Sequence, residues 1–417
     1  TLSAIKRSYG LSTIVNHYEE HDHSLRSHVM PIYQTTSFGF KDMAEAEKTF
    51  SGRNRDNFVY TRGRNPNAVS LAKKIAMLEG VDLLRAAPDK AAEEIVAGHC
   101  FASGMGAITA VVFSLLKSGD HIVTHTSLYS GTHKLFTEIC PNLGITVSII
   151  DSANVKDWEK AMADNPTTRL VYVETPSNPR IELHDLKALA DLAHENDAWV
   201  AVDNTAATPY HQRPLTLGCD LVIHSSTKFL NGHGVALGGA VVSRHPKFVD
   251  FWGTLGQSAM EFGATPSPSD CWLTSMGIKT FAIRMERHAS NAMALANLLN
   301  EHAKVREVFY PGLPENEFHE LAKSQMLNGF GSFMSFEVDG DKAAAHRLIE
   351  ALNLPTIAIS FGSTDSVIQV PASMTHSGIS KEDRMRAGIS DCLVRFCVGI
   401  EDIADILDDF DQALRAV

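Results

Sequence analysis

The sequence of 417 residues contains no long hydrophobic run. Its most apolar stretch, Ala107 to Leu116, is far too short to cross a bilayer, because a membrane-spanning helix needs about 20 apolar residues. The first residues include no apolar core of the kind found in secretion signals. These features argue against a membrane protein and against export. Internal repeats and low-complexity tracts are also missing.

Basic residues are in the minority and form no block. The chain has 37 Lys and Arg against 49 Asp and Glu, which gives a formal net charge of −12. Proteins that bind nucleic acids through charge present clustered basic side chains. The sequence therefore argues against a nucleic-acid partner.

Cysteine is scarce, and its spacing includes no CxxC pair. Most of the six cysteines lie in apolar surroundings in the sequence. This pattern argues against a disulfide framework or a zinc site and predicts a protein of the reducing cytoplasm. The cysteines are Cys100, Cys140, Cys219, Cys271, Cys392 and Cys397.

Histidines near the start suggest a metal site, but the set of ligands is incomplete. His17, His21, Asp22, His23 and His28 lie in a polar segment, and no downstream residues complete the coordination. We therefore predict no metal and interpret this segment as a solvated arm.

The length predicts two domains. Residues 1–60 are predicted to form an extended arm with one helix, Met43 to Thr49. Residues 61–259 alternate helical and short apolar segments, which indicates a mostly parallel sheet covered by helices. In residues 260–417 a long helix, Cys271 to His302, precedes strands such as Gly331 to Val338. This change predicts a smaller α+β domain.

The most informative stretch is LVIHSSTKFLNGHGVALGG at 221–239. A short apolar strand ends in a tract rich in hydroxyls and glycines, which contains the single lysine Lys228. Because desolvating an ammonium is costly, a lysine placed there suggests a nucleophilic amine. The preceding hydroxyls, including Ser225 and Thr227, could bind a phosphate. A solvated loop lysine is the alternative for this residue taken alone.

Three other predicted strands also end in polar residues. Asp203 follows the strand Trp199 to Val202, where a carboxylate could pair with a protonated pyridine nitrogen. Asn178 follows LVYVETPS, and Gly104 begins a predicted helix whose free N–H groups favour a phosphate. Each of these residues could instead be a turn former or a helix cap. Their convergence at one sheet edge favours a site.

The chain resembles the Cys/Met-metabolism enzymes that depend on pyridoxal phosphate (PLP), the cystathionine γ-synthase/methionine γ-lyase group. The similarity runs from about Ile32 to Ile406. Matching segments occur in the family's order: YTRGRNP at 60–66, ASGMGAI at 102–108, YSGTHKLF at 129–136, ETPSNP at 174–179, VDNT at 202–205, HSSTKFLNGHG at 224–234, GIKTFAIRMERH at 277–288, YPGLP at 310–314, PASMTHS at 371–377 and LVRFCVGIEDI at 393–403.

This resemblance implies an α/β fold of the type I class of PLP-dependent transferases, similar to aspartate aminotransferase. We then expect a mostly parallel seven-stranded sheet and a smaller C-terminal α+β domain. The implied cofactor is pyridoxal 5′-phosphate. The implied assembly is a homotetramer made of two active dimers, in which the N-terminal arm contacts the neighbouring subunit.

The resemblance also implies roles for residues around the cofactor. Lys228 would bind it covalently and later move protons, and Asp203 would pair with the pyridine nitrogen. Asn178 would contact the ring oxygen and lie near the substrate, and Tyr129 would stack on the ring and act as an acid or base. The phosphate would be held by Ser225, Thr227 and the backbone of Gly104 and Met105.

Further implied roles concern the substrate and the neighbouring subunit. Arg395 would clamp the substrate carboxylate, with Ser360 nearby. Tyr60 and Arg62 would reach the phosphate of a neighbouring subunit's cofactor. From the residues alone, Arg395 could instead snorkel from an edge strand, and Tyr129 could be ordinary half-buried core. Tyr60 and Arg62 could belong to a solvated loop or an anion site.

The implied reaction takes place at Cγ of a sulfur amino acid or a homoserine ester. We expect γ-elimination from a methionine-like substrate, giving a 2-oxo acid, ammonia and a thiol. The alternative is γ-replacement on O-acetyl- or O-succinyl-homoserine. Ile359 stands where members that handle cystathionine often have Glu, which favours a smaller apolar group. Gly131 and Ser130 depart from the methionine γ-lyase pattern of Cys and Gly. A non-catalytic protein of the same fold is disfavoured because Lys228 and the residues implied to act with it are all present.

Overall fold

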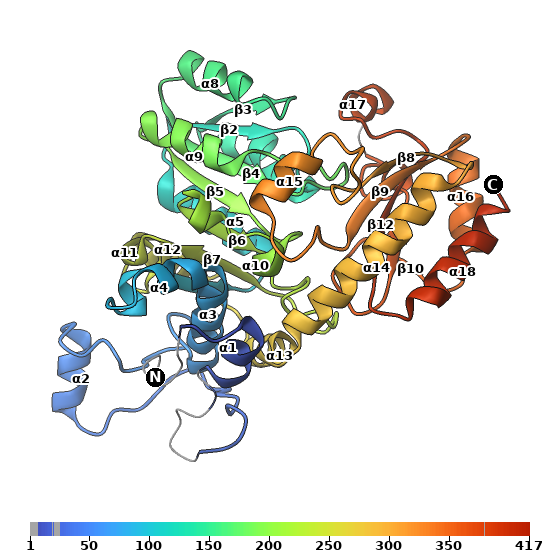
Figure 1. Cartoon of the computed structure of the whole chain (residues 1–417). Coiled ribbons are helices and arrows are strands. Elements are labelled where there is room, and N and C mark those ends of the chain that lie inside the picture. The colour runs from blue at the N-terminus through green and yellow to red at the C-terminus, as the bar shows by residue number, and fades with distance from the viewer. Residues whose placement is uncertain (1–6, 19, 21–25, 379) are drawn as a thin grey trace.

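The computed structural model describes residues 7–18, 20, 26–378 and 380–417. Two sheets lie in separate halves of the molecule, each with helices packed against it (Figure 1). Helices α13 (Pro268–Ile278) and α14 (Phe281–Glu301) connect the two halves. The segment that carries α2 (Met43–Phe50) extends away from both.

Within the described chain, seven strands form the larger sheet in the order β1-β7-β6-β5-β4-β2-β3. Only β7 runs against the others, since its pairings with β1 and β6 are both antiparallel. The mostly parallel seven-stranded sheet that we expected is therefore confirmed. Its strands are β1 (Ala97–Phe101), β2 (His121–His125), β3 (Thr146–Ile150), β4 (Thr168–Glu174), β5 (Trp199–Asp203), β6 (Leu221–His224) and β7 (Gly239–Ser243).

Helices cover both faces of this sheet. On one face, Ile75 of α3 (Pro66–Glu79) packs in a core with Val222 and Val242. On the other face, Val111 of α5 (Gly104–Leu115) packs with Ile223. The inner strands are buried on both sides, which explains why their sequences are nearly continuous apolar runs. Further helices of this half are α4 (Val81–Ala86), α6 (Ser130–Lys134), α7 (Cys140–Asn142), α8 (Val155–Asp164), α9 (Leu186–Glu195), α10 (Thr208–His211), α11 (Pro246–Val249) and α12 (Thr254–Phe262), with short turns η2 (Ala92–Glu94), η3 (Leu135–Ile139) and η4 (Pro214–Leu217).

The smaller sheet, as far as the structure describes it, has five strands in the order β10-β11-β12-β9-β8. Its pairings are antiparallel except for β10 with β11. Helices on one side complete the expected α+β unit. The elements are β8 (Val305–Phe309), β9 (Phe333–Val338), β10 (Thr356–Ile357), β11 (Val367–Gln369), β12 (Leu393–Cys397), α15 (His319–Gln325), α16 (Lys342–Ala351), η5 (Pro371–Ser373), α17 (Lys381–Arg386) and α18 (Ile403–Leu414).

The single long helix expected at Cys271 to His302 is wrong, because two helices occupy this segment. At the end of α13 the backbone hydrogen bonds change from the i→i−4 to the tighter i→i−3 pattern. The Lys279 N–H donates to the Met276 carbonyl (3.2 Å), and the Thr280 N–H donates to the Gly277 carbonyl (3.3 Å). Helix α14 then begins at Phe281. The apolar pattern continues across the break, so periodicity alone did not reveal it.

The N-terminal arm also differs from the prediction of one helix. Helix α2 confirms the expected segment, but α1 (Leu11–His17) was not predicted. Ile14 and Val15 of α1 are buried in the same core as α3 and α14. This short helix is stabilised by tertiary packing rather than by its own length.

Two sequence predictions concern features that the structure describes only in part. Of the candidate metal ligands, His21, Asp22 and His23 lie outside the described residues. Among the residues that are described, no cluster of His, Cys, Asp or Glu is arranged to hold a metal ion. Within the same residues, no helix is both long and apolar enough to span a membrane.

Candidate active site

The carboxyl ends of four strands meet at one edge of the larger sheet. Strands β4, β5 and β6 are parallel neighbours. Strand β1 runs in the same direction as β6, because β7 lies between them and is antiparallel to both. Beyond these ends lies a cavity of about 240 Å³. Its wall includes most of the predicted site residues: Gly104, Met105, Tyr129, Asn178, Asp203, Ser225, Thr227, Lys228 and Arg395.

Lys228 lies in the turn that follows β6, and its side chain is partly buried. Burial lowers the pKa of Lys228 to about 8, with a smaller contribution from the positive charge of Arg395. Lys228 Nζ donates a hydrogen bond of 2.8 Å to Ser360 Oγ. The loop that carries Ser360 approaches closely because Gly362 has φ +86°, and a Cβ there would lie 2.7 Å from the Phe229 nitrogen. The lysine is therefore an amine that can be neutral near physiological pH.

Asp203 ends β5 and is held by hydroxyl groups. Thr205 donates to Asp203 Oδ1 from both its backbone N–H (3.1 Å) and its Oγ1 (2.5 Å), and Tyr172 donates to Oδ2 (3.3 Å). Burial raises the pKa of Asp203, while these hydrogen bonds lower it. The carboxylate is thus fixed in place, in surroundings where a cationic partner would stabilise its ionised form.

The residues that could bind a phosphate gather at the N-terminus of α5. Ser103 caps this helix by accepting a hydrogen bond from the Gly106 N–H (3.1 Å). A Cβ at Gly104 would lie 2.8 Å from Ser225 Cβ, so this wall requires glycine. The Thr227 hydroxyl bonds the backbone of Gly238. Free N–H groups and hydroxyls therefore converge at the positive end of a helix dipole.

Asn178 lies in the loop after β4 and has an unused acceptor. Its side chain is 9% exposed, yet Oδ1 has no hydrogen-bond partner among the described residues. A buried amide oxygen without a partner is costly unless a ligand donates to it. Asn178 therefore indicates where a ligand hydroxyl or amine would lie.

Arg395 lies in the middle of β12, between β11 and β9, and is 1% exposed. The alternative that it snorkels from an edge strand is therefore wrong. Its Nη2 donates to the carbonyl oxygens of Ile359 (3.1 Å) and Ser360 (2.8 Å). With its amide oxygen turned toward the guanidinium, Gln369 accepts from Nε (3.0 Å) and Nη1 (2.8 Å). Burial lowers the pKa of Arg395 to about 10, so it stays cationic at neutral pH.

Tyr129 immediately precedes α6, and its side chain is 47% exposed. It borders the cavity, which places it in the cavity wall rather than in a closed hydrophobic core. A Cβ at Gly131 would lie 2.7 Å from Tyr129 Cε1 and 3.0 Å from Met105 Sδ. The glycine at position 131 thus gives the tyrosine ring its space.

Glu174 and His376 are among the wall residues that the sequence analysis did not single out. Glu174 pairs in register with Asp203 on the neighbouring strand. It accepts hydrogen bonds from the backbone N–H groups of Tyr129 (2.8 Å) and Asn178, and burial raises its pKa well above the usual range. His376 is 6% exposed and lines the cavity from the smaller domain. Glu174 could have been found, because it ends a predicted strand as Asp203 does.

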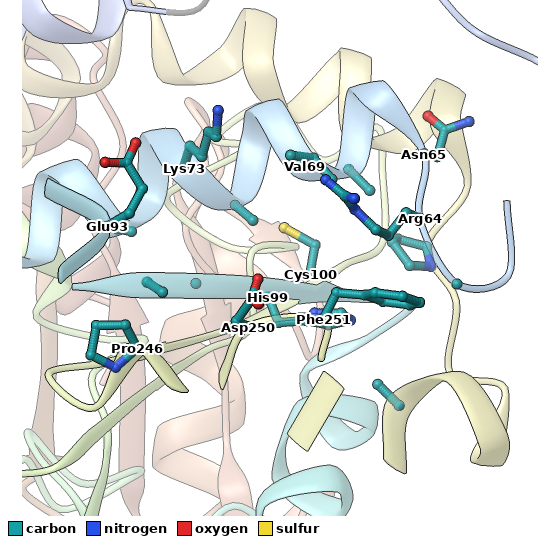
Figure 2. A pocket seen from close by; sticks show the side chains of 18 of the residues that line it. Arg64, Asn65, Val69, Lys73, Glu93, His99, Cys100, Pro246, Asp250 and Phe251 are labelled. Atoms are coloured by element: carbon teal, nitrogen blue, oxygen red, sulfur yellow. The ribbon is translucent and has the colours of Figure 1, made fainter. Parts of the chain in front are cut away.

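Tyr60 and Arg62 lie elsewhere in the chain. They line a separate hollow with Gln34 and Thr265, and the Arg62 guanidinium lies over the Tyr60 ring at 5.5 Å. Arg62 also borders the cavity of about 360 Å³ shown in Figure 2. There α3 lies on one side of β1, and Asp250 and Phe251 lie on the other. One copy of the chain therefore does not bring Tyr60 and Arg62 to Lys228.

Comparisons with known proteins agree with this geometry. The family described as "Cys/Met metabolism PLP-dependent enzyme" matches residues 12–415. The chain is 43% identical over 389 residues to an L-methionine gamma-lyase of Fusobacterium nucleatum, covering 93% of each protein. It is 40% identical over 390 residues to an O-succinylhomoserine sulfhydrylase of Pseudomonas aeruginosa, covering 94% of this chain and 91% of that protein.

A solved structure of the same kind superimposes closely. It is a cystathionine gamma synthase from Xanthomonas oryzae pv. oryzae in complex with aminoacrylate and cysteine. The TM-score is 0.88 at 35% sequence identity, and the match covers 98% of each chain. The similarity therefore extends through both sheets.

Proposed function

This chain belongs to the Cys/Met metabolism PLP-dependent enzymes, and from that premise we propose that it catalyses γ-elimination at Cγ of a methionine-like amino acid. The products would be a 2-oxo acid, ammonia and a thiol. The observation that carries the proposal is the convergence of Lys228, Asp203 and Arg395 on one cavity whose outer wall includes the apolar Ile359.

The residues around the cavity fit pyridoxal 5′-phosphate. Lys228 would bind its aldehyde, Asp203 would pair with its ring nitrogen, and the unpartnered Asn178 Oδ1 would accept from its ring hydroxyl. Ser225, Thr227 and the N-terminus of α5 would hold its phosphate. Tyr129 would cover one face of the ring.

PLP, when bound, supplies an electron sink that stabilises negative charge at the substrate Cα. Lys228 Nζ is then the group that takes the Cα proton and returns a proton later. Its pKa of about 8 suits this work, because an amine near neutrality exchanges protons readily. Ser360 Oγ, 2.8 Å from Nζ, orients the amine. The Tyr129 hydroxyl is the candidate acid at the departing γ-substituent.

Arg395 would orient the substrate by binding its carboxylate. Its guanidinium is fixed by Gln369 and by two backbone carbonyls, so little side-chain entropy is lost when the substrate binds. Because Arg395 is buried, its interaction with an anion is stronger than it would be in water.

The wall near the γ-substituent supports a small apolar leaving group. Ile359 lines the cavity and offers no charge to a distal ammonium such as that of cystathionine. Gly131, however, has no thiol, in contrast to the methionine γ-lyase pattern. Together with the 40% identity to an O-succinylhomoserine sulfhydrylase, this keeps γ-replacement on a homoserine ester as the second candidate.

We also propose that a second copy of the chain completes the site. In one chain Tyr60 and Arg62 face a different hollow, and the arm exposes the apolar Met43 and Phe50 of α2. Exposed apolar side chains on a projecting segment favour burial against a partner. The arm of one copy would thus bring Tyr60 and Arg62 to the phosphate of the other, in a dimer that pairs into a tetramer.

The proposed location is the reducing cytoplasm. All six cysteines lie in the described part of the chain, where each is a buried thiol outside any disulfide. Burial raises the pKa of Cys219 and Cys271, and this makes reactive thiolates rare.

Steady-state assays of the PLP-loaded enzyme test the proposed reaction. Elimination predicts rapid release of 2-oxobutyrate from L-methionine without an added thiol. Replacement predicts that O-succinylhomoserine is consumed only when sulfide, cysteine or methanethiol is present. If L-methionine releases no 2-oxobutyrate while the homoserine ester turns over with a thiol, the elimination proposal is wrong. Sodium borohydride treatment followed by peptide mapping should label Lys228.

A further inference from the structure

A second polar cavity lies beside the candidate active site. It has a volume of about 440 Å³ and lies between the carboxyl ends of β2 and β3 and the smaller domain. From the larger domain it is lined by His125, Thr126, Ser127, Ile150, Asp151, Ser152, Ala153, Asn154, Arg180, Glu182 and His184, and from the smaller domain by Glu317, Phe318, Arg386, Ala387 and Gly388.

Two buried imidazoles in its wall have unused nitrogens. His125 and His184 are each 2% exposed, and their ring centroids are 4.4 Å apart. His125 Nε2 accepts from the Glu174 backbone N–H at 2.9 Å, so the proton of the neutral ring is on Nδ1. That Nδ1 and both nitrogens of His184 have no partner among the described residues. Buried groups of this kind are normally satisfied, which indicates a polar ligand.

Charges of both signs surround these imidazoles. Arg180 Nε forms an ion pair of 3.5 Å with Glu182 Oε1 without a hydrogen bond of good geometry, and Nη1 donates to the Gly388 carbonyl at 3.3 Å. Burial raises the pKa of Glu182, Arg180 and a hydrogen bond from Ser127 lower it, and the charges of Glu317 and Asp151 raise it by smaller amounts. Two cationic side chains, Arg180 and Arg386, lie in the same wall as three carboxylates, and this mixture suits a ligand that carries both a carboxylate and an ammonium. Ile150, Phe318 and Ala387 add an apolar part to the wall.

The two cavities share two segments of chain. Residues 125–130 contribute Ser127 to the second cavity and Tyr129 to the first. The loop after β4 contributes Asn178 to the first and Arg180 to the second. Glu174 joins the two segments, because it bonds His125 and Tyr129 of the first segment and accepts a hydrogen bond from the Asn178 backbone N–H of the second. A ligand that shifts either segment would therefore move residues of the active site.

We propose that the second cavity binds a free α-amino acid with an apolar side chain and that its occupancy changes the affinity of the active site. The carboxylate of this ligand would lie at Arg180 and its ammonium among Glu182, Glu317 and Asp151. The imidazole N–H and nitrogen groups would complete its hydrogen bonds. This binding requires no turnover, so it stands apart from the choice between elimination and replacement.

Calorimetry on the holoenzyme reduced with borohydride tests the binding, because reduction blocks covalent exchange at Lys228. The probe is L-methionine, compared with 4-(methylthio)butanoate and 3-(methylthio)propylamine, which lack the ammonium and the carboxylate. We expect saturable binding of L-methionine and at least tenfold weaker binding of both analogues, since each loses a charge-assisted hydrogen bond worth about tenfold or more. No saturable binding at millimolar L-methionine would overturn the proposal.

Variants separate the second cavity from the first. Arg180→Met should weaken binding about tenfold or more, whereas Arg169→Met, at an exposed arginine on β4, should not. Glu317→Gln should weaken it, and Glu315→Gln, two residues away, should not. Ala153→Phe fills the cavity without removing a polar group and should abolish binding. If Arg180→Met and Ala153→Phe both bind L-methionine as the parent enzyme does, the ligand lies in the first cavity and the proposal is wrong.

Steady-state kinetics test the coupling between the second cavity and the active site. L-leucine has no leaving group at Cγ and is not turned over, although it can compete with the substrate at Lys228. In the unreduced enzyme it should change the KM for the substrate beyond this competition, by about fivefold or more for a typical coupling. Ala153→Phe should remove this effect. A purely competitive effect that persists in Ala153→Phe would overturn the regulatory part of the proposal.

Discussion

Lys228 Nζ donates a hydrogen bond of 2.8 Å to Ser360 Oγ, although the two residues are 132 positions apart. Lys228 follows β6 of the larger sheet, and Ser360 follows β10 of the smaller one. The same loop supplies two carbonyl oxygens to Arg395. The amine that would carry the cofactor and the cation that would hold the substrate are therefore positioned by a single loop.

The lowered pKa of Lys228 predicts the pH dependence of cofactor uptake by the apoenzyme. Only the neutral amine attacks an aldehyde, so uptake should rise about tenfold per pH unit below the pKa and level off above about 8. An unperturbed lysine would continue to rise to about pH 10.4. Stopped-flow absorbance of bound PLP measures this profile. Lys228→Ala should show no covalent uptake and no turnover, and a profile without a plateau below pH 10 would contradict the lowered pKa.

Glu174 and Asp203 should respond differently to removal of charge. Because burial raises the pKa of Glu174 well above its usual range, its ionised form is disfavoured, and we predict that Glu174→Gln keeps kcat/KM within about twofold. Asp203→Asn should lower kcat by about a hundredfold or more, because the amide cannot stabilise a protonated ring nitrogen.

Glu174→Ala serves as the control for that pair. It leaves the Tyr129 and Asn178 N–H groups without their acceptor, which should cost about 1–3 kcal/mol of stability. Kinetics and thermal unfolding of the three variants distinguish these effects. Equal losses in Glu174→Gln and Asp203→Asn would show that Glu174 acts as an anion.

Arg395→Lys should raise KM more than it lowers kcat. Lysine keeps the charge but cannot bind a carboxylate with two parallel hydrogen bonds, which should cost about 1.5–3 kcal/mol, or roughly 10- to 150-fold in KM. Gln369→Ala should have a smaller effect of the same kind, because it releases the guanidinium without removing it. A KM unchanged in Arg395→Lys would mean that the substrate carboxylate binds elsewhere.

Gly131→Cys should displace Tyr129. A Cβ at this position would lie 2.7 Å from the tyrosine ring and 3.0 Å from Met105 Sδ, so the ring must move. Overpacking of about 1–3 kcal/mol should lower kcat/KM by roughly 5- to 150-fold. Gly131→Ala separates this steric effect from thiol chemistry, and Gly39→Ala, where a Cβ meets nothing within 4 Å, is the neutral control. Higher activity in Gly131→Cys alone would favour a role for the thiol.

Mixed oligomers should reveal the contribution of the second copy. A chain with Lys228→Ala should be inactive alone, and a chain with Arg62→Ala should be weakly active alone. Randomly mixed dimers would contain one intact site in half of the molecules, which predicts recovery of about a quarter of the parent activity. Arg62→Ala alone should also release PLP more easily. No recovery on mixing would mean that Lys228 and Arg62 act within one chain or do not act together.

Much of the large sheet was predictable because its strands are short, apolar and followed by polar residues. Lys228, Asp203, Asn178 and Gly104 were placed together by the rule that parallel strands end at one edge. The break between α13 and α14 was not predictable, because the apolar period continues across Lys279 and Thr280. Helix α1 was missed because seven residues carry too little periodic signal to be distinguished from a loop.

The sequence by itself determined the strands whose ends form the site, the lysine at one of those ends and the family to which the chain belongs. Local patterns of apolar and polar residues, read along the chain, are sufficient for these features. Only the tertiary structure decided that Arg395 is buried in a central strand, that Glu174 lies beside Asp203, and that His125 and His184 line a second cavity. Each of these facts depends on contacts between segments far apart in sequence, and burial, hydrogen bonding and pKa follow from those contacts rather than from residue type.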